Sequence, residues 1–131
     1  MGLATFIGGI HPYEGKELSE DKPIQFIVPE KGEEMVYPLS QHIGAPAKPL
    51  VAKGDQVLKG QIIAEAGGFI SANVLSSVSG TVKGIEPRLV ANGAMVQSII
   101  VENDGEENAI EGFGNARDYT KLSKEEIRNI I

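Results

Sequence analysis

The sequence predicts an all-β domain followed by the start of a short C-terminal helix, and three observations carry this prediction. The 131 residues include 16 glycines and 7 prolines but only 5% aromatic residues, which is typical of tight turns around a core of small aliphatic side chains. Short runs rich in valine and isoleucine alternate with those turn residues. A strand–turn–strand pattern also occurs twice. A chain of this length holds one domain with short extensions.

The repeat is the most informative of these observations. VAKGDQV at 51–57 matches VANGAMV at 90–96, and IIAE at 62–65 matches IIVE at 99–102, in the same order. Two related strand–turn–strand units indicate a β structure with pseudo-twofold symmetry. Chance similarity of short valine- and glycine-rich words is the alternative, and the matching order argues against it.

Glycines mark the expected turns and bends. Asn92-Gly93 suits a turn with positive φ at both central positions, and Gly54 with Asp55 forms a similarly permissive pair. Bends or close backbone approaches are expected at three further glycines, Gly60, Gly80 and Gly84.

We expect three segments: an N-terminal extension with a strand at 1–34, the β domain at 35–104, and a linker with the first turns of a helix at 105–131. The strand of the extension is IQFIV at 24–28, bounded by prolines, and MVYPL at 35–39 opens the domain. The segment that follows, SQHIGAPAKP, is expected to be extended because its prolines exclude a helix.

The C-terminal helix has a sequence signature at its start. Ser123 is the expected N-cap, and Glu126 completes a capping box. Ile127, Ile130 and Ile131 would form its apolar stripe. Because the pattern stops after about two turns, which is too short for a stable isolated helix, we expect the chain to lead into a further domain. A frayed natural terminus is the alternative.

Composition excludes several classes of function. The formal charge of −6 argues against binding to nucleic acid and to anionic lipid surfaces. Without cysteine, these residues form neither disulfides nor thiolate-held zinc or iron–sulfur sites. The apolar runs are far shorter than the ~20 residues that a membrane-spanning helix needs, so we expect no direct membrane insertion.

No catalytic, cofactor-binding or metal-binding constellation is predicted within this chain. It contains neither a GxGxxG nucleotide motif nor a GxSxG nucleophile elbow. His11 and His42 lie far apart and lack a flanking carboxylate or cysteine cluster, so structural roles in turns are favoured over roles as metal ligands or general bases.

The central run at 51–86 resembles the biotinyl/lipoyl carrier family. The matching positions are Gly54, Asp55, Val57, Gly60, Gln61, Gly80, Thr81 and Val82. The resemblance implies the barrel-sandwich hybrid fold, in which two sheets interleave. That family carries its cofactor on a hairpin lysine, and here no lysine occurs between Lys59 and Lys83.

The hairpin at 64–74 carries an apolar tip in place of that lysine. Phe69 and Ile70 have no amine for biotin or lipoate, and we predict that they contact a partner protein. A hairpin folded back onto its own core is the alternative.

A second resemblance covers nearly the whole chain, and its most specific parts are four short sequence words in order. It is similar to the N-terminal part of the RnfC subunit of the Rnf electron-transport complex. The words are GGIHP at 8–12, QHIGAP at 41–46, GGFISA at 67–72 and SGTV at 79–82. Two positions depart from that pattern: Asn73 replaces the usual proline, and Leu75 a common histidine. The family motif positions expected to be structural are His42, Gly44, Pro46, Gly54, Asp55, Gly60, Gln61 and Gly80.

The resemblance implies a longer polypeptide with further machinery. Its downstream parts would carry an FMN- and NADH-binding domain and two 4Fe-4S clusters held by cysteines, none of which lies in these residues. The Rnf complex passes electrons between ferredoxin and NAD, coupled to sodium or proton movement, and its RnfC subunit is peripheral at the cytoplasmic face of the cell membrane. The implied partners are the other Rnf subunits and the downstream flavin/NADH domain.

We therefore expect a structural and docking domain within an oxidoreductase, with no catalytic residue of its own. One alternative is the related barrel-containing A subunit of sodium-pumping NADH–quinone reductase. A second is a free-standing carrier domain acylated at Lys59 or Lys83, and a third is a small-ligand protein that uses the SQHIGAP turn.

Overall fold

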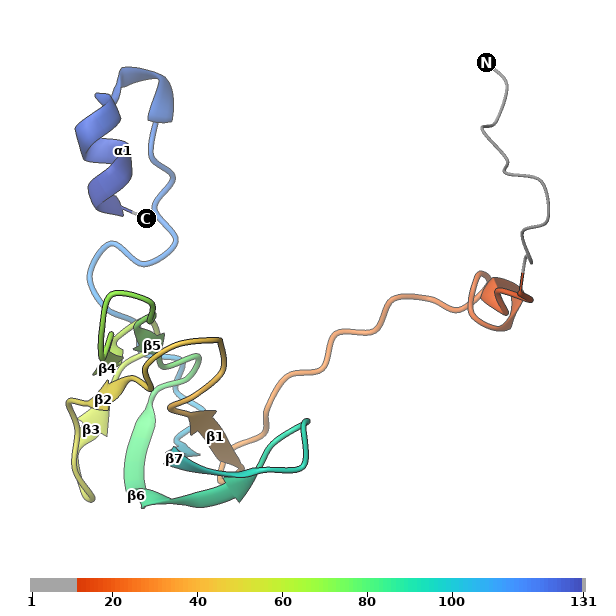
Figure 1. Ribbon diagram of the computed structural model, residues 1–131, viewed down its shortest axis with the longest axis horizontal. Coiled ribbons are helices and arrows are strands. Elements are labelled where there is room, and N and C mark those ends of the chain that lie inside the picture. The colour runs from red at the N-terminus through yellow and green to blue at the C-terminus, as the bar shows by residue number, and fades with distance from the viewer. Residues whose placement is uncertain (1–11, 131) are drawn as a thin grey trace.

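The computed structural model describes residues 12–130, and its strands form two antiparallel sheets (Figure 1). One sheet has four strands in the order β1-β7-β6-β3, and the other has three in the order β2-β4-β5. The strands are β1 (Glu34–Pro38), β2 (Lys48–Pro49), β3 (Gln56–Val57), β4 (Ile62–Glu65), β5 (Val74–Leu75), β6 (Gly80–Leu89) and β7 (Met95–Asn103). The predicted all-β fold and the strand that opens the domain are confirmed.

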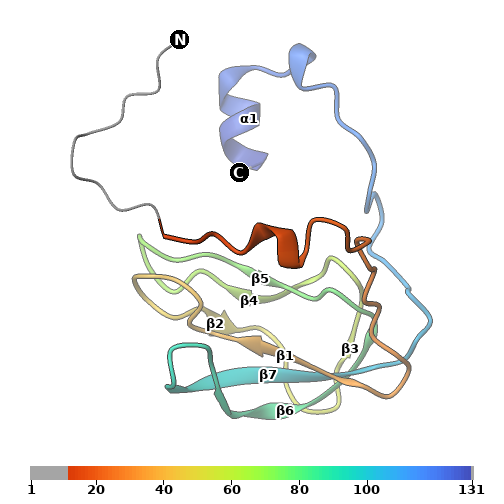
Figure 2. The same ribbon diagram turned by 90° about the vertical axis from the view of Figure 1, so that its right-hand side faces the viewer.

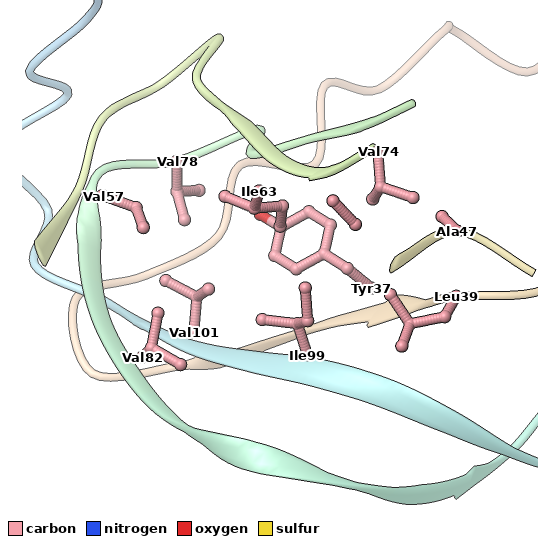
Figure 3. Packing of buried hydrophobic residues seen from close by; sticks show 11 residues of the cluster. Tyr37, Leu39, Ala47, Val57, Ile63, Val74, Val78, Val82, Ile99 and Val101 are labelled. Atoms are coloured by element: carbon pink, nitrogen blue, oxygen red, sulfur yellow. The ribbon is translucent and has the colours of Figure 1, made fainter. Parts of the chain in front are cut away.

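The core lies between the two sheets. Figure 3 shows the ring of Tyr37 between Ile63 of the three-stranded sheet and Ile99 of the four-stranded sheet. Both isoleucines are 0% exposed. They come from the two copies of the repeat, IIAE in β4 and IIVE in β7, although the first copy spans both sheets because its Val57 lies in β3. Ala64, next to Ile63, is buried in the same core, where the register of β4 against β5 shifts.

The Tyr37 hydroxyl links β1 to the loop between β5 and β6 through polar contacts. The backbone N–H of Ser77 donates to the hydroxyl at 3.0 Å, and the Ser77 hydroxyl lies 2.9 Å away. A buried hydroxyl without a partner would cost about 1–3 kcal/mol, so these bonds make tyrosine acceptable at this depth.

Backbone contact at Gly80 sets the start of the long β6–β7 ribbon. A Cβ at this position would collide with the carbonyl oxygen of Glu102 on β7. Further along, the register shifts between Val82 and Gly84, which marks the bend of β6. The expected close approach and bend at these glycines are confirmed.

The two turns of the repeat share one feature. Gly54 has φ 97° and its counterpart Gly93 has φ 83°, as their places in the repeat predict. The expectation of positive φ at Asn92 is wrong, since Glu107 is the only non-glycine with positive φ among residues 12–130. Asn92 instead accepts a hydrogen bond on Oδ1 from the N–H of Ala94 at 3.0 Å, which closes the turn with its side chain.

The strand expected at 24–28 does not form. This segment lies outside both sheets and is part of an arm, residues 12–29, that extends away from the barrel. A short 3-10 helix at Lys16–Leu18 lies near the outer end of the arm (Figure 1). Asn103 holds the inner end of the arm, because its Nδ2 donates to the carbonyls of Pro29 at 3.1 Å and Glu30 at 3.0 Å.

After β7 the chain crosses back over the barrel before it leaves. Lys59 and Ala109 form a parallel bridge, with hydrogen bonds from Lys59 N–H to the Asn108 carbonyl at 2.9 Å and from Ile110 N–H to the Lys59 carbonyl at 3.0 Å. We call residues 107–113 the strap. The first part of the segment that the sequence indicated as a linker is thus packed against the barrel.

The chain then forms a 3-10 helix at Tyr119–Lys121 and helix α1 (Lys124–Ile130), drawn beyond the barrel in Figure 2. The predicted capping box is confirmed: Glu126 N–H donates to Ser123 Oγ at 3.2 Å, and Ser123 N–H donates to Glu126 Oε2 at 2.8 Å. Ile127 and Ile130 are partly exposed, and Ile131 lies outside the described residues.

Candidate functional site

Two loops that are far apart in the sequence meet at one end of the barrel. They are residues 40–46, between β1 and β2, and residues 66–73, between β4 and β5. The Ala45 N–H donates to the Ile70 carbonyl at 3.0 Å, and the Ser71 hydroxyl donates to the Ala45 carbonyl at 2.8 Å. These bonds join the QHIGAP and GGFISA words into one structural unit.

His42 adds a further bond between the loops. Its Nε2 accepts a hydrogen bond from the Ala72 N–H at 3.0 Å, while Nδ1 lies 2.9 Å from the Ile43 carbonyl. Since Nε2 is an acceptor here, Nδ1 must carry the proton and donate it to that carbonyl. Both ring nitrogens are therefore used within the loops, and the imidazole has no free nitrogen for a metal or a substrate.

Glycine is required where the loops touch. A Cβ on Gly44 would collide with the carbonyl of Ile70, and a Cβ on Gly67 would collide with the carbonyl of Pro46. Gly44 also has φ 115°, a conformation that side chains rarely adopt. The two glycines allow the backbones to approach closely enough to form the bonds described above.

The base of the hairpin is closed by polar side chains. Asn73 accepts a hydrogen bond on Oδ1 from the Ala66 N–H at 2.8 Å, and the Gly67 N–H donates to the Ser71 hydroxyl at 2.9 Å. Asn73 is one of the two departures from the Rnf pattern. Proline has no side-chain acceptor, so this bond is a feature of asparagine at that position.

The paired loops present three large apolar side chains to solvent. Phe69 is fully exposed, Ile43 is 89% exposed and Ile70 is 61% exposed. We call these three residues the apolar tip. Phe69 and Ile70 are the residues for which the sequence predicts contact with a partner protein, and that contact stays a prediction. The full exposure of Phe69 does not fit the alternative in which it folds back onto the core. Ile43 was missed, because only the pairing of the loops places it beside them.

Shallow hollows lie on either side of His42. One is lined by the loop at 40–43 and the turn at 90–92, and the other by the loop and residues 72–74. Their polar groups are mainly neutral side chains, and His42 itself is fully bonded. Nothing in either hollow specifies a charged or metal-bound ligand.

The remaining family motif positions close turns of the barrel. Asp55 accepts on Oδ2 from the Ala52 N–H at 2.8 Å, and Gln61 accepts on Oε1 from the Leu58 N–H at 2.9 Å. The Gly60 N–H donates to the Ser76 carbonyl at 2.7 Å. Each contact fixes backbone, and none aims a reactive group at a shared point.

Each of the two lysines that the carrier alternative could use for acylation forms an ion pair. Lys59 Nζ lies 2.5 Å from Glu107 and 5.8 Å from the centroid of the Phe113 ring. Lys83 Nζ lies 2.9 Å from Glu102, and this hydrogen bond raises the pKa of the lysine above its ordinary value.

No group of three or more histidine, cysteine, aspartate or glutamate side chains is arranged to bind a metal ion within residues 12–130. With no cysteine in the sequence, thiolate-held iron–sulfur clusters do not fit these residues. Nor does any helix in the described part of the chain have the length and apolar character to cross a membrane. His11 and most of the GGIHP word lie outside the described residues.

Comparison with known proteins gives a consistent result. The family model described as the RnfC barrel sandwich hybrid domain matches residues 4–106. The C subunit of a proton-translocating ferredoxin:NAD(+) oxidoreductase complex from Clostridium ljungdahlii is 40% identical over 130 residues, which are 98% of this chain and 28% of that protein. The Na(+)-translocating counterpart from Acetobacterium woodii is 46% identical over 101 residues, 77% of this chain and 22% of that protein.

A third relative is more distant. The C subunit of the ion-translocating oxidoreductase complex of Vibrio cholerae is 36% identical over 131 residues, 98% of this chain and 17% of that protein. The chain thus spans less than a third of the length of each of these three relatives.

Proposed function

Because the chain belongs to the RnfC family, whose barrel-sandwich hybrid domain it matches over residues 4–106, we propose that it is the docking barrel of an RnfC-type subunit. The subunit would serve in a complex that transfers electrons between ferredoxin and NAD, as the names of its relatives state for those proteins. The relatives translocate different ions, so the proposal names no ion. Neither the related quinone reductase subunit nor a carrier domain is favoured by these matches.

The observation that carries the docking role is the apolar tip. Three large apolar side chains project from loops that are fixed by backbone and side-chain hydrogen bonds. Exposed apolar clusters of this kind mark contacts with other proteins, and aromatic side chains dominate the energy of such contacts. We propose that Phe69, with Ile43 and Ile70 beside it, packs into another subunit of the complex.

The redox cofactors belong outside this barrel in the proposal. An FMN/NADH site and two 4Fe-4S clusters would lie in the rest of the subunit, since the barrel has neither thiolates nor a phosphate-binding glycine loop. The subunit would sit peripherally at the cytoplasmic face of the membrane. The barrel's contribution is then positional: it holds the redox domains against the membrane-bound part.

Recovery of the complex tests the docking role. Phe69→Ala in the complete subunit should weaken its association with the other subunits by about thirtyfold, because interface aromatics contribute ~2 kcal/mol or more. Leu89→Ala, at an exposed apolar residue on the β6–β7 ribbon, is the matched control and should have no effect. Unchanged recovery with Phe69→Ala, or an equal loss with Leu89→Ala, would contradict the proposal.

A further inference from the structure

The arm contains a segment whose sequence and structure disagree. Residues 24–28 read IQFIV, a composition strongly favoured in strands, yet they lie in neither sheet. Ile24, Phe26 and Ile27 are 91%, 93% and 94% exposed. A run of large apolar side chains this exposed is unfavourable in water, so the segment has the properties of a strand that lacks its partner.

The prolines define where such a strand begins and ends. Pro23 and Pro29 flank the segment and cannot donate to a ladder, which leaves five amides between them for pairing. The segment lies in no helix or strand, and none of these five amides donates a hydrogen bond to a backbone carbonyl within residues 12–130. The segment therefore has the length of an ordinary short strand and a full set of unused donors.

The barrel fixes the inner end of this segment. Besides the bonds from Asn103 to Pro29 and Glu30, the Gly32 N–H donates to the Asn103 carbonyl at 2.8 Å. The Glu33 N–H donates to the Glu30 carbonyl at 3.2 Å and closes the turn into β1. The point from which the segment departs is thus set by the fold.

The chain that follows β7 begins beside the root of the arm. Lys31 Nζ lies 3.5 Å from Glu106, and a Cβ on Gly105 would lie 3.0 Å from the Lys31 Cβ. The strap then carries this chain across the barrel to Lys59 before it leaves. The arm and the chain beyond the strap are thus tethered to the same small barrel, and two segments tethered to one body meet at a high effective concentration, which favours pairing within one polypeptide.

The charge of the arm disfavours a lipid partner. Residues 14–22 contain Glu14, Glu17, Glu20 and Asp21 against two lysines. An anionic lipid surface would repel this stretch, whereas the free edge of a sheet offers both backbone acceptors and an apolar face.

We propose that residues 24–28 form a β-strand on the free edge of a sheet in the part of the same polypeptide that follows residue 131. The proposal rests on the proposed function, because it takes the chain to be part of a polypeptide as long as its relatives. The arm then joins the barrel to the next domain at a second point, in addition to the covalent connection.

Hydrogen–deuterium exchange in the complete, purified subunit tests the pairing. The amides of 24–28 should exchange at least about tenfold more slowly than in an unstructured peptide, because ladder hydrogen bonds protect them. Phe26→Pro should abolish this protection and leave the β6–β7 amides unaffected, while Lys22→Pro, outside the strand, should preserve it. Free exchange of 24–28 in the complete subunit would overturn the proposal.

A photo-crosslinking amino acid at position 26 identifies the segment that pairs with residues 24–28. We expect a cross-link to a peptide beyond residue 131 in the isolated subunit, with no other subunit present. A cross-link to β1, or protection that arises only in the assembled complex, would assign the strand to another partner and overturn the proposal. The subunit's intact mass and its recovery with the complex are measured separately, so failure of the proposed function is distinguishable from failure of the pairing.

Discussion

The imidazole Nε2 of His42 accepts a hydrogen bond from the backbone N–H of Ala72, thirty residues further along the chain, at 3.0 Å. This bond crosses from one loop to the other, next to Ile43 in the first loop and two residues after Ile70 in the second. It gives the histidine of the QHIGAP word a mechanical role, and it explains why a side chain with one donor and one acceptor nitrogen is suited to the position.

Replacing His42 by alanine should therefore loosen the tip without unfolding the barrel. We expect the Ala72 amide to exchange faster and the free energy of unfolding to fall by about 0.5–1 kcal/mol, the range for one partly solvated hydrogen bond. Gln41→Ala is the control, since the Gln41 side chain donates to the Pro38 carbonyl at the end of β1 and does not bond to the other loop. Equal Ala72 exchange in His42→Ala and in the native chain would show that the bond does not hold the loops.

Adding a methyl group at Gly67 should separate the loops more severely. The new Cβ would collide with the Pro46 carbonyl, a backbone atom that cannot rotate away. We expect Gly67→Ala to lower the free energy of unfolding by about 2 kcal/mol or more, whereas Gly84→Ala, with open space around it, should cost less than about 1 kcal/mol. Chemical denaturation of the two variants makes the comparison, and similar costs would contradict the close approach.

The strap should be coupled to Gly60 through Phe113. A Cβ on Gly60 would lie 2.5 Å from the Phe113 ring, and Gly60 has φ 84°. Gly60→Ala should therefore be destabilising, and part of its cost should disappear in a chain that already carries Phe113→Ala. A double-mutant cycle by thermal unfolding measures this coupling, expected at about 0.5 kcal/mol or more. Strictly additive effects would mean that the strap does not pack on Gly60.

Asp104 should make the fold sensitive to acid. Its carboxylate accepts hydrogen bonds from the Ser79 hydroxyl at 2.7 Å and the Glu106 N–H at 2.8 Å, and these bonds, that from Ser79 first, lower the pKa of Asp104 below its ordinary value. A lowered pKa means that the carboxylate stabilises the fold above its ordinary pKa of about 4, and that this stabilisation is lost as the pH falls through the folded-state pKa.

The variant Asp104→Asn tests this dependence. It should be less stable than the native chain at neutral pH, and the difference should shrink below about pH 4 as the native carboxylate becomes protonated. A constant difference between Asp104→Asn and the native chain from about pH 7 to about pH 2 would contradict the assignment.

Local chemistry accounts for the parts of the fold that the sequence predicts well. Positive φ at Gly54 and Gly93 and the Ser123–Glu126 capping box each depend on neighbouring residues alone, so they are visible in the sequence. These features, with the repeat and the four family words, were enough to predict the all-β fold class. The sequence left open whether the hairpin tip is exposed or folded back onto the core.

The failures are contacts between distant residues. At 24–28 the strand-forming composition is present, but no neighbouring strand accepts it within the described chain. Ile43 belongs to the tip only because Ala45 bonds to Ile70. The strap pairs Lys59 with Ala109, and no periodicity in the strap's own sequence signals this pairing.

The most direct test of the docking claim places a photo-crosslinking amino acid at Phe69 in the complete subunit, within the native membrane-bound complex. We predict a cross-link to another subunit, and none from the same amino acid placed at Leu89. A Phe69 probe that links to no other subunit, or links no better than the Leu89 probe, would contradict the account.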